Sequence, residues 1–288
     1  MKRLLLLLLP ALSGALPALA GLLWARPKPG ASPTVDPAPL GAAARLFQGP
    51  LAGTRNFLLP FSFLQADRLL RQGRIEEGKR AALRLLSEAP WLETVWIQVG
   101  WTLAYAGWDR LSSPRARALR MAQVEAWLAL ASQVLPADPD PPATLAFLLA
   151  ERMPPRSETA RAWKKLRGRS PVESSDAWLR EALRRAPGRR AFLARRSAAA
   201  LRLAGEAFAA GREKACVSFL RRALALESRL SQEKDSSART WIRGIRALLD
   251  LVSRPRPWPE ARLRRLADSP PAALFFQAAG IDKGEGGV

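Results

Sequence analysis

The stretch that decides the fold is residues 61–90, FSFLQADRLLRQGRIEEGKRAALRLLSEAP. Apolar residues recur at spacings of three and four in both halves, which is the period of a helix that buries one face. Gly73-Arg74 interrupts the pattern, and a glycine at this point allows the chain to reverse sharply after a helix. Pro90 closes the second half. The stretch therefore predicts two antiparallel helices joined by a tight turn.

A pattern of small residues with a fixed internal spacing occurs three times along the chain. A first copy of the pattern starts at Ala66, a second starts 34 residues later at Gly100, and a third starts at Ala204. In each copy a glycine follows seven residues after the start, where the turn is expected. We predict that the following residues pack one helix closely against another or make the turns: Ala66, Gly73, Gly78, Trp96, Gly100, Gly107, Ala204, Gly211 and Cys216.

The segment WIQVGWTL, residues 96–103, resembles the opening of a tetratricopeptide repeat, W-x₂-L-G-x₂-Y, with Val99 and Leu103 in place of Leu and Tyr. The resemblance covers residues 61–107 and 197–228 and departs over 111–196. It implies an all-α fold, a right-handed array of α-hairpins (a TPR-like α-solenoid) whose concave groove binds peptides or helices. A different array of α-hairpins and an irregular helical bundle are the alternatives.

The remaining residues from about 57 to 279 are also helical in pattern, with no credible strand. We expect one helical repeat domain over 57–279 and a disordered glycine-containing tail over 280–288. Residues 26–56 are rich in proline and are expected to form an extended linker.

The N-terminus has the pattern of an export signal. Residues 4–25 carry no charge, and Ala18-Leu19-Ala20 fits the small-x-small motif of a cleavage site. An uncleaved membrane anchor is the main alternative, because about 20 apolar residues span a bilayer. A buried helix of a cytosolic fold is the third. Either main interpretation places the protein outside the cytoplasm, in the periplasm or tethered to the membrane.

Composition limits the chemistry. The 288 residues include no histidine and one cysteine, so His-dependent catalysis, a His-ligated metal and an intrachain disulfide are excluded. Glu76-Glu77 suits the first turn of a helix, and Lys214 with Ser218 is more typical of a surface pair than of a catalytic dyad. Cys216 occupies a packing position. The sequence predicts no enzyme activity, no cofactor and no metal.

An aromatic strip on one expected helix is the first candidate binding site. On the helix expected over 92–106, Ile97, Trp101 and Tyr105 form a second apolar face beside the packing face. Tetratricopeptide geometry would point this face into the groove. The expected groove residues are Phe63, Leu70, Ile97, Trp101, Tyr105, Leu201 and Phe208. The alternative is that the linker, or the long segment 111–135, fills the groove.

An arginine-rich segment is the second candidate. Residues 152–196 hold 14 Lys and Arg against four acids, about half of the chain's formal net charge of +21. This charge would suit an acidic lipid surface, a wall polymer or, least favoured in an exported protein, nucleic acid. The expected anion contacts are Arg184, Arg185, Arg189, Arg190, Arg195 and Arg196. The alternative is a solvated surface in an arginine-biased protein. The sequence thus predicts a protein- or peptide-binding scaffold of the cell envelope, with a polyanion-binding module as the second hypothesis.

Overall fold

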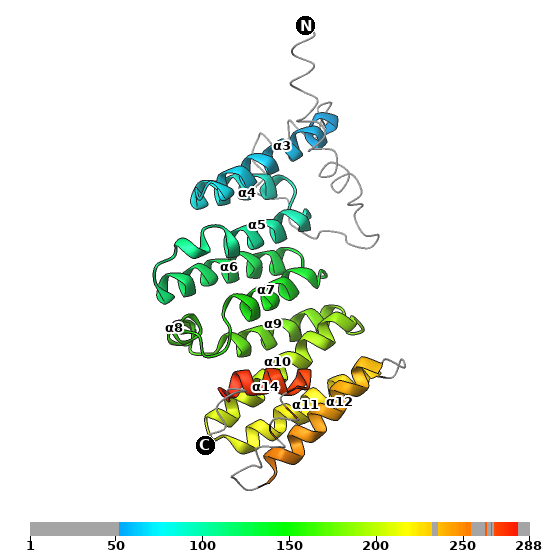
Figure 1. The fold of residues 1–288 in the computed structure, drawn as a ribbon. Coiled ribbons are helices and arrows are strands. Elements are labelled where there is room, and N and C mark those ends of the chain that lie inside the picture. Colours follow the sequence, from blue (N-terminus) through cyan, green and yellow to red (C-terminus); the bar gives the residue numbers. More distant parts are fainter. Residues whose placement is uncertain (1–51, 232–235, 255–262, 264–265, 267, 282–288) are drawn as a thin grey trace, which may run out of the picture. The chain divides into compact units, whose positions relative to one another are not determined.

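The computed structural model describes residues 52–231, 236–254, 263, 266 and 268–281, and all regular structure in this part of the chain is helical (Figure 1). The all-α prediction is therefore confirmed. The expected signal or anchor over 1–25, most of the linker and the tail from residue 282 lie outside the described residues. None of the helices described combines the length and the apolar character needed to cross a bilayer.

The chain divides into two compact units, one ending at Ala106 and the other beginning at Gly107. The first contains α3 (Ala52–Arg71), α4 (Ile75–Glu88) and α5 (Glu93–Tyr105), and each of these helices packs against the other two. Helix α3 starts at Ala52, within the proline-rich linker expected over residues 26–56. Its first residues are therefore helical rather than extended.

The hairpin predicted from residues 61–90 is present as α3 and α4. Gly73 adopts a left-handed backbone with φ of +79° at the turn. Gly78 lies so close to α3 that a Cβ there would be 2.5 Å from Cγ of Leu70. Absence of a side chain at Gly78 is thus the local reason that the two helices approach closely.

The second unit opens with the short 3₁₀ helix η1 (Trp108–Arg110) and continues through helices of ten to 21 residues. Their bounds are α6 (Pro114–Val134), α7 (Asp140–Arg152), α8 (Glu158–Arg167), α9 (Pro171–Arg185), α10 (Arg190–Ala209), α11 (Glu213–Ser231), α12 (Ser236–Val252) and α14 (Pro270–Ala279). Serine caps fix several starts. Ser113 accepts a hydrogen bond from the N–H of Ala116, as its position before a proline predicts. Ser170 and Glu173 form a reciprocal capping box at α9.

Helix α10 is central in the second unit, where it packs against α9, α11 and α14 (Figure 1). Helix α14, the last helix described, also contacts α12, so it completes the apolar core formed by α10, α11 and α12. Sequence reasoning did not assign a partner to α14. Small residues again permit close contact, since a Cβ on Gly244 of α12 would lie 2.5 Å from Cγ of Pro271.

Candidate functional site

Helix α5 has two apolar faces. The first is buried and contains Trp96, Val99 and Leu103, and the Trp96 indole donates a hydrogen bond of 3.0 Å to the carbonyl of Pro90. The second is only partly buried. Here Trp101 and Tyr105 stack with ring centroids 5.4 Å apart and planes 15° from parallel.

The other predicted groove residues fall into two groups. Phe63 and Ile97 are half-buried. Leu70 and Leu201 are completely buried, and Phe208 is buried with its ring 5.6 Å from that of Phe275. Side chains in the core do not contact a partner, so these three residues pack the fold instead. Phe208 is covered by α14.

The residues predicted to pack the repeats lie where close contacts occur. Gly73, Gly107 and Gly211 all have positive φ and stand at helix ends. The other members of the set are buried: Ala66, Gly78, Trp96, Gly100, Ala204 and Cys216. Cys216 is not part of a disulfide and has no exposed surface, so its thiol is not accessible from solvent.

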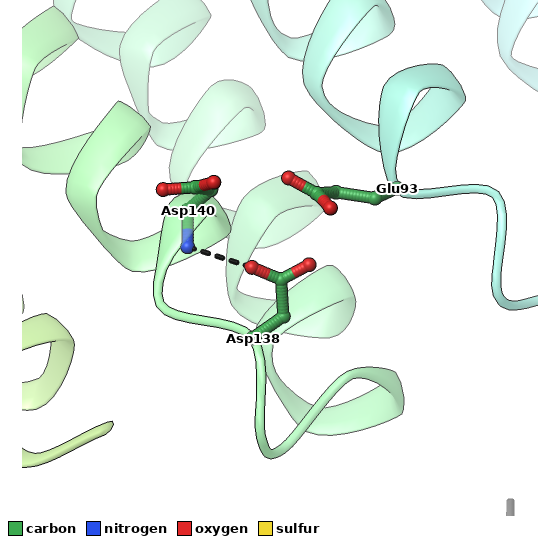
Figure 2. A group of neighbouring side chains, drawn as sticks. All are labelled: Glu93, Asp138 and Asp140. Atoms are coloured by element: carbon green, nitrogen blue, oxygen red, sulfur yellow. Dashed lines mark hydrogen bonds between the residues drawn. The ribbon is translucent and has the colours of Figure 1, made fainter. Parts of the chain in front are cut away.

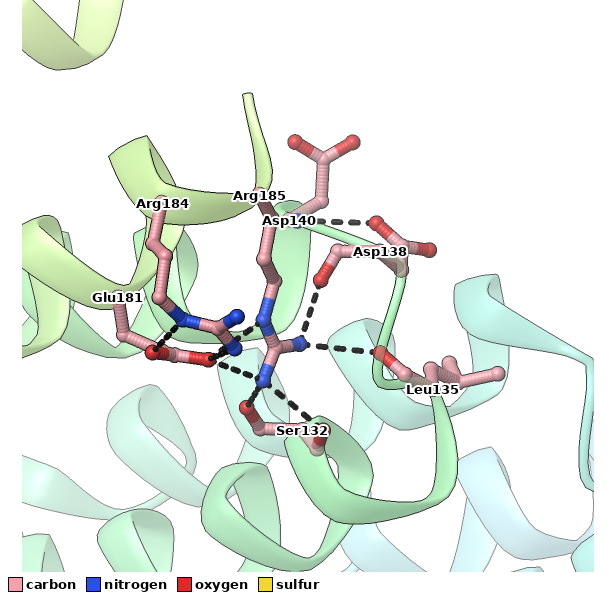
Figure 3. Close-up of polar contacts among 7 residues, drawn as sticks. All are labelled: Ser132, Leu135, Asp138, Asp140, Glu181, Arg184 and Arg185. Carbon is pink, nitrogen blue, oxygen red and sulfur yellow. Dashed lines mark hydrogen bonds and ion pairs between the residues drawn. The ribbon is translucent and has the colours of Figure 1, made fainter. Parts of the chain in front are cut away.

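Arg185 crosslinks three segments of the second unit (Figure 3). Its guanidinium donates to the hydroxyl of Ser132 at 2.6 Å, to the carbonyls of Ser132, Leu135 and Asp138 at 2.8–3.1 Å, and to Glu181 at 2.8 Å. These three carbonyls lie at the end of α6 and in the following turn, where no further helical turn can donate hydrogen bonds to them. Arg185 therefore holds the end of α6 on α9.

Most of the other predicted anion contacts have internal partners. Arg184 donates two hydrogen bonds to the carboxylate of Glu181. Together, Arg184 and Arg185 lower the pKa of Glu181 to about 2, chiefly through the hydrogen bond from Arg184. Arg189 pairs with Asp140, and the guanidinium of Arg195 lies 5.0 Å from the ring centroid of Phe147. Arg190 is exposed at the start of α10.

The sixth predicted contact, Arg196, belongs to a cluster around Asp176, a carboxylate that is 4% exposed. Arg180 and Arg222 also pair with Asp176. Sequence analysis missed this cluster because its members come from three helices. The sequence signal that could have revealed the cluster is Asp176, an acidic residue at a buried position of α9.

Glu125 is a second buried acid that sequence analysis missed. It pairs with Arg167 at 2.6 Å and Arg169 at 3.2 Å, and it accepts a hydrogen bond of 3.4 Å from the indole of Trp178. Glu125 stands within the buried face of α6, next to Val124. An acid at an apolar position of a helix in an arginine-rich chain signals such an internal ion pair.

Two acidic residues, Asp138 and Asp140, lie at the start of α7 (Figure 2). Asp138 accepts a hydrogen bond of 2.9 Å from the backbone N–H of Asp140. The residue before α7 is Pro139, and no described side chain caps the start of this helix. Asp140 is the first residue of the helix, where its negative charge interacts favourably with the helix dipole.

The remaining groups considered for catalysis make surface contacts. Glu77 pairs with Arg74, whose hydrogen bond lowers the pKa of this carboxyl, and Glu76 pairs with Lys79. Lys214 and Ser218 are both exposed on α11. None of these groups lies beside an apolar hollow of about 510 Å³, which Trp241, Pro270, Ala273, Leu274 and Gln277 line between α12 and α14. Among the described residues, the lining of this hollow therefore contains no acid, base or nucleophile.

Comparison of the chain with known protein families, with curated proteins and with solved structures gives no match.

Proposed function

We propose that the chain is a non-enzymatic scaffold that binds a protein or peptide through the second face of α5. The observation that carries this proposal is the stacked pair of Trp101 and Tyr105, which is half-buried although α5 already buries its opposite face. A helix that is apolar on two faces uses the second one for a further contact.

Aromatic residues of this kind suit partner binding. Tryptophan and tyrosine bury large areas and are enriched among the residues that dominate binding energy. Stacking restricts both rings before a partner arrives, so less side-chain entropy is lost on binding. Ile97 lies one turn before Trp101 and extends the apolar strip along the same helix.

The fold proposed for this scaffold is a tetratricopeptide-like array. Its support is the hairpin of α3 and α4, in which Gly78 packs on Leu70, and the hairpin of α10 and α11, in which Gly211 makes the turn. A single hairpin cannot bury its apolar face, which explains why such units stack.

We further propose that the scaffold acts in the cell envelope. The support is the sequence pattern of residues 1–25, a basic start followed by an uncharged apolar stretch and a small-x-small motif. Fractionation of the native host, followed by N-terminal sequencing, tests this part. A mature N-terminus at Gly21 would indicate cleavage, Met1 in the membrane fraction would indicate an anchor, and recovery in the cytosol would refute both.

The polyanion-binding hypothesis finds less support. Arg185 is directed into the fold, and Arg184 and Arg189 have carboxylate partners. A guanidinium whose charge is balanced by a carboxylate of its own attracts an external anion less strongly than an uncompensated one. We therefore rank protein binding first.

Partner capture tests the proposal. The tagged chain and the variants Trp101→Ala and Tyr105→Ala are incubated with solubilised envelope proteins, and bound proteins are identified by mass spectrometry. Trp91→Ala is the matched control, because Trp91 is an exposed aromatic residue of the same unit outside the strip. Loss of the same partner from both strip variants, but not from the control, supports the proposal. Equal recovery with folded strip variants refutes the assignment to α5.

A further inference from the structure

The cluster around Asp176 holds more positive than negative charge. Arg196 Nε lies 3.2 Å from Oδ1, and Arg222 and Arg180 lie 3.4 Å and 3.5 Å from Oδ2. The three guanidinium groups come from α10, α11 and α9, and one carboxylate serves all of them. Within the part of the chain that the structure describes, no other acid pairs with these arginines, so two positive charges are left uncompensated.

The cluster is open to solvent on one side. The side chain of Asp176 is 5% exposed, whereas those of Arg180, Arg222 and Arg196 are 60%, 39% and 22% exposed. Asp176 therefore forms the floor, and the arginines form the rim. Phe219 supports the rim, because the guanidinium of Arg222 lies 5.3 Å from its ring centroid.

The rim retains hydrogen-bonding capacity. A guanidinium has five N–H donors, and among the described residues the polar partner of each of these arginines is Asp176. Arg185 differs, since its guanidinium is satisfied by four backbone and side-chain oxygens in addition to Glu181. Free donors on an uncompensated guanidinium favour an external oxyanion, which they can bind in pairs.

We propose that Arg180, Arg196 and Arg222 bind side-chain carboxylates of an acidic protein segment above Asp176. Separate carboxylates fit this site better than a single phosphate, because the arginines come from three different helices and can each meet a different carboxylate along one chain. The site lies apart in sequence from Trp101 and Tyr105 and does not depend on the aromatic strip.

A labelled oligoglutamate peptide serves as the probe. Its binding to the full-length chain is followed by fluorescence anisotropy at about 0.05 M salt, where exposed charges are weakly screened. The test variant is Arg180→Gln/Arg222→Gln, in which Arg196 remains beside Asp176 as its counter-ion. The control is Arg161→Gln/Arg184→Gln, which removes the same charge from two exposed arginines that pair with Glu158 and Glu181.

We expect the affinity of the test variant to fall about tenfold, corresponding to about 1.4 kcal/mol, and that of the control to stay within about twofold. An equal fall in both variants would show diffuse attraction and overturn the site. Absence of binding to the unaltered chain would overturn it as well. Displacement of the peptide by inorganic phosphate, beyond that by sodium chloride of the same ionic strength, would overturn the choice of carboxylate ligand. Trp101→Ala should bind the peptide normally, so this result is separable from that for the aromatic strip.

Discussion

Gly205 of α10 packs directly against the main chain of α14 at Phe275. A Cβ on Gly205 would collide with the carbonyl oxygen of Phe275, and it would also lie 2.8 Å from Cβ of Ala278. A backbone oxygen cannot move away by changing rotamer, so a larger residue must displace α14.

Gly205→Ala is therefore expected to lower the free energy of unfolding by about 1–3 kcal/mol, as overpacking of a core does. Thermal unfolding measures the loss, and hydrogen exchange over 270–279 should become faster if α14 is displaced. Gly188→Ala is the control, because a Cβ at Gly188 would meet no atom within 4 Å. This control should change stability by no more than about 0.5 kcal/mol. Similar behaviour of both variants would contradict the close contact.

Arg185 and Arg184 are neighbours with different roles, which their substitution should reveal. The side chain of Arg185 is 7% exposed, and that of Arg184 is 70% exposed. Arg185→Met removes the donor that the structure shows for the carbonyls of Ser132 and Asp138, and we expect a loss of about 2–4 kcal/mol in unfolding free energy. Arg184→Met removes only an exposed surface pair and should lower the unfolding free energy much less than Arg185→Met does. Urea denaturation of both variants compares them, and an equal cost would argue against the crosslink.

The helical hairpins could be predicted from sequence because their determinants are local. The spacing of Ala66, Gly73 and Gly78 encodes a small packing residue, a turn and a second small residue, and neighbouring helices need little else. The aromatic strip of α5 was predictable for the same reason, since it follows helical periodicity within one element.

The partners of the arginines and of α14 could not be predicted in this way. Arg185 meets Ser132 some 50 residues earlier, and Asp176 gathers arginines from three helices. Such pairings depend on which helices become neighbours, a long-range property that periodicity does not encode. The same limit led us to place Leu201 and Phe208 in a groove, although α14 covers Phe208.

Glu206 is expected to destabilise the fold at neutral pH. Burial raises the pKa of its carboxyl above the ordinary value of 4.5, and the hydrogen bond from Ser170 offsets this effect only in part. The folded state then binds more protons than the unfolded state just above pH 4.5, so stability falls as the pH rises through this range. Glu206→Gln keeps an acceptor for Ser170 and should be more stable than the unaltered chain at pH 7. The difference should disappear below pH 4.5, and a difference that is independent of pH would refute this explanation.

Glu181 has the opposite effect and should govern part of the acid unfolding. Arg184 and Arg185 lower its pKa from 4.5 to about 2, so the carboxylate stabilises the folded state above pH 4.5. This contribution is lost as the pH falls from about 4.5 towards 2, because the unfolded state binds the proton first. Chemical denaturation at a series of pH values should show a shallower loss of stability over this range in Glu181→Gln. Glu158→Gln is the control, since Glu158 is exposed and its only described ion pair, with Arg161, is 3.7 Å long. If the unfolding free energy of Glu181→Gln falls with decreasing pH as steeply as that of the unaltered chain, the two arginines do not stabilise the fold through this carboxylate.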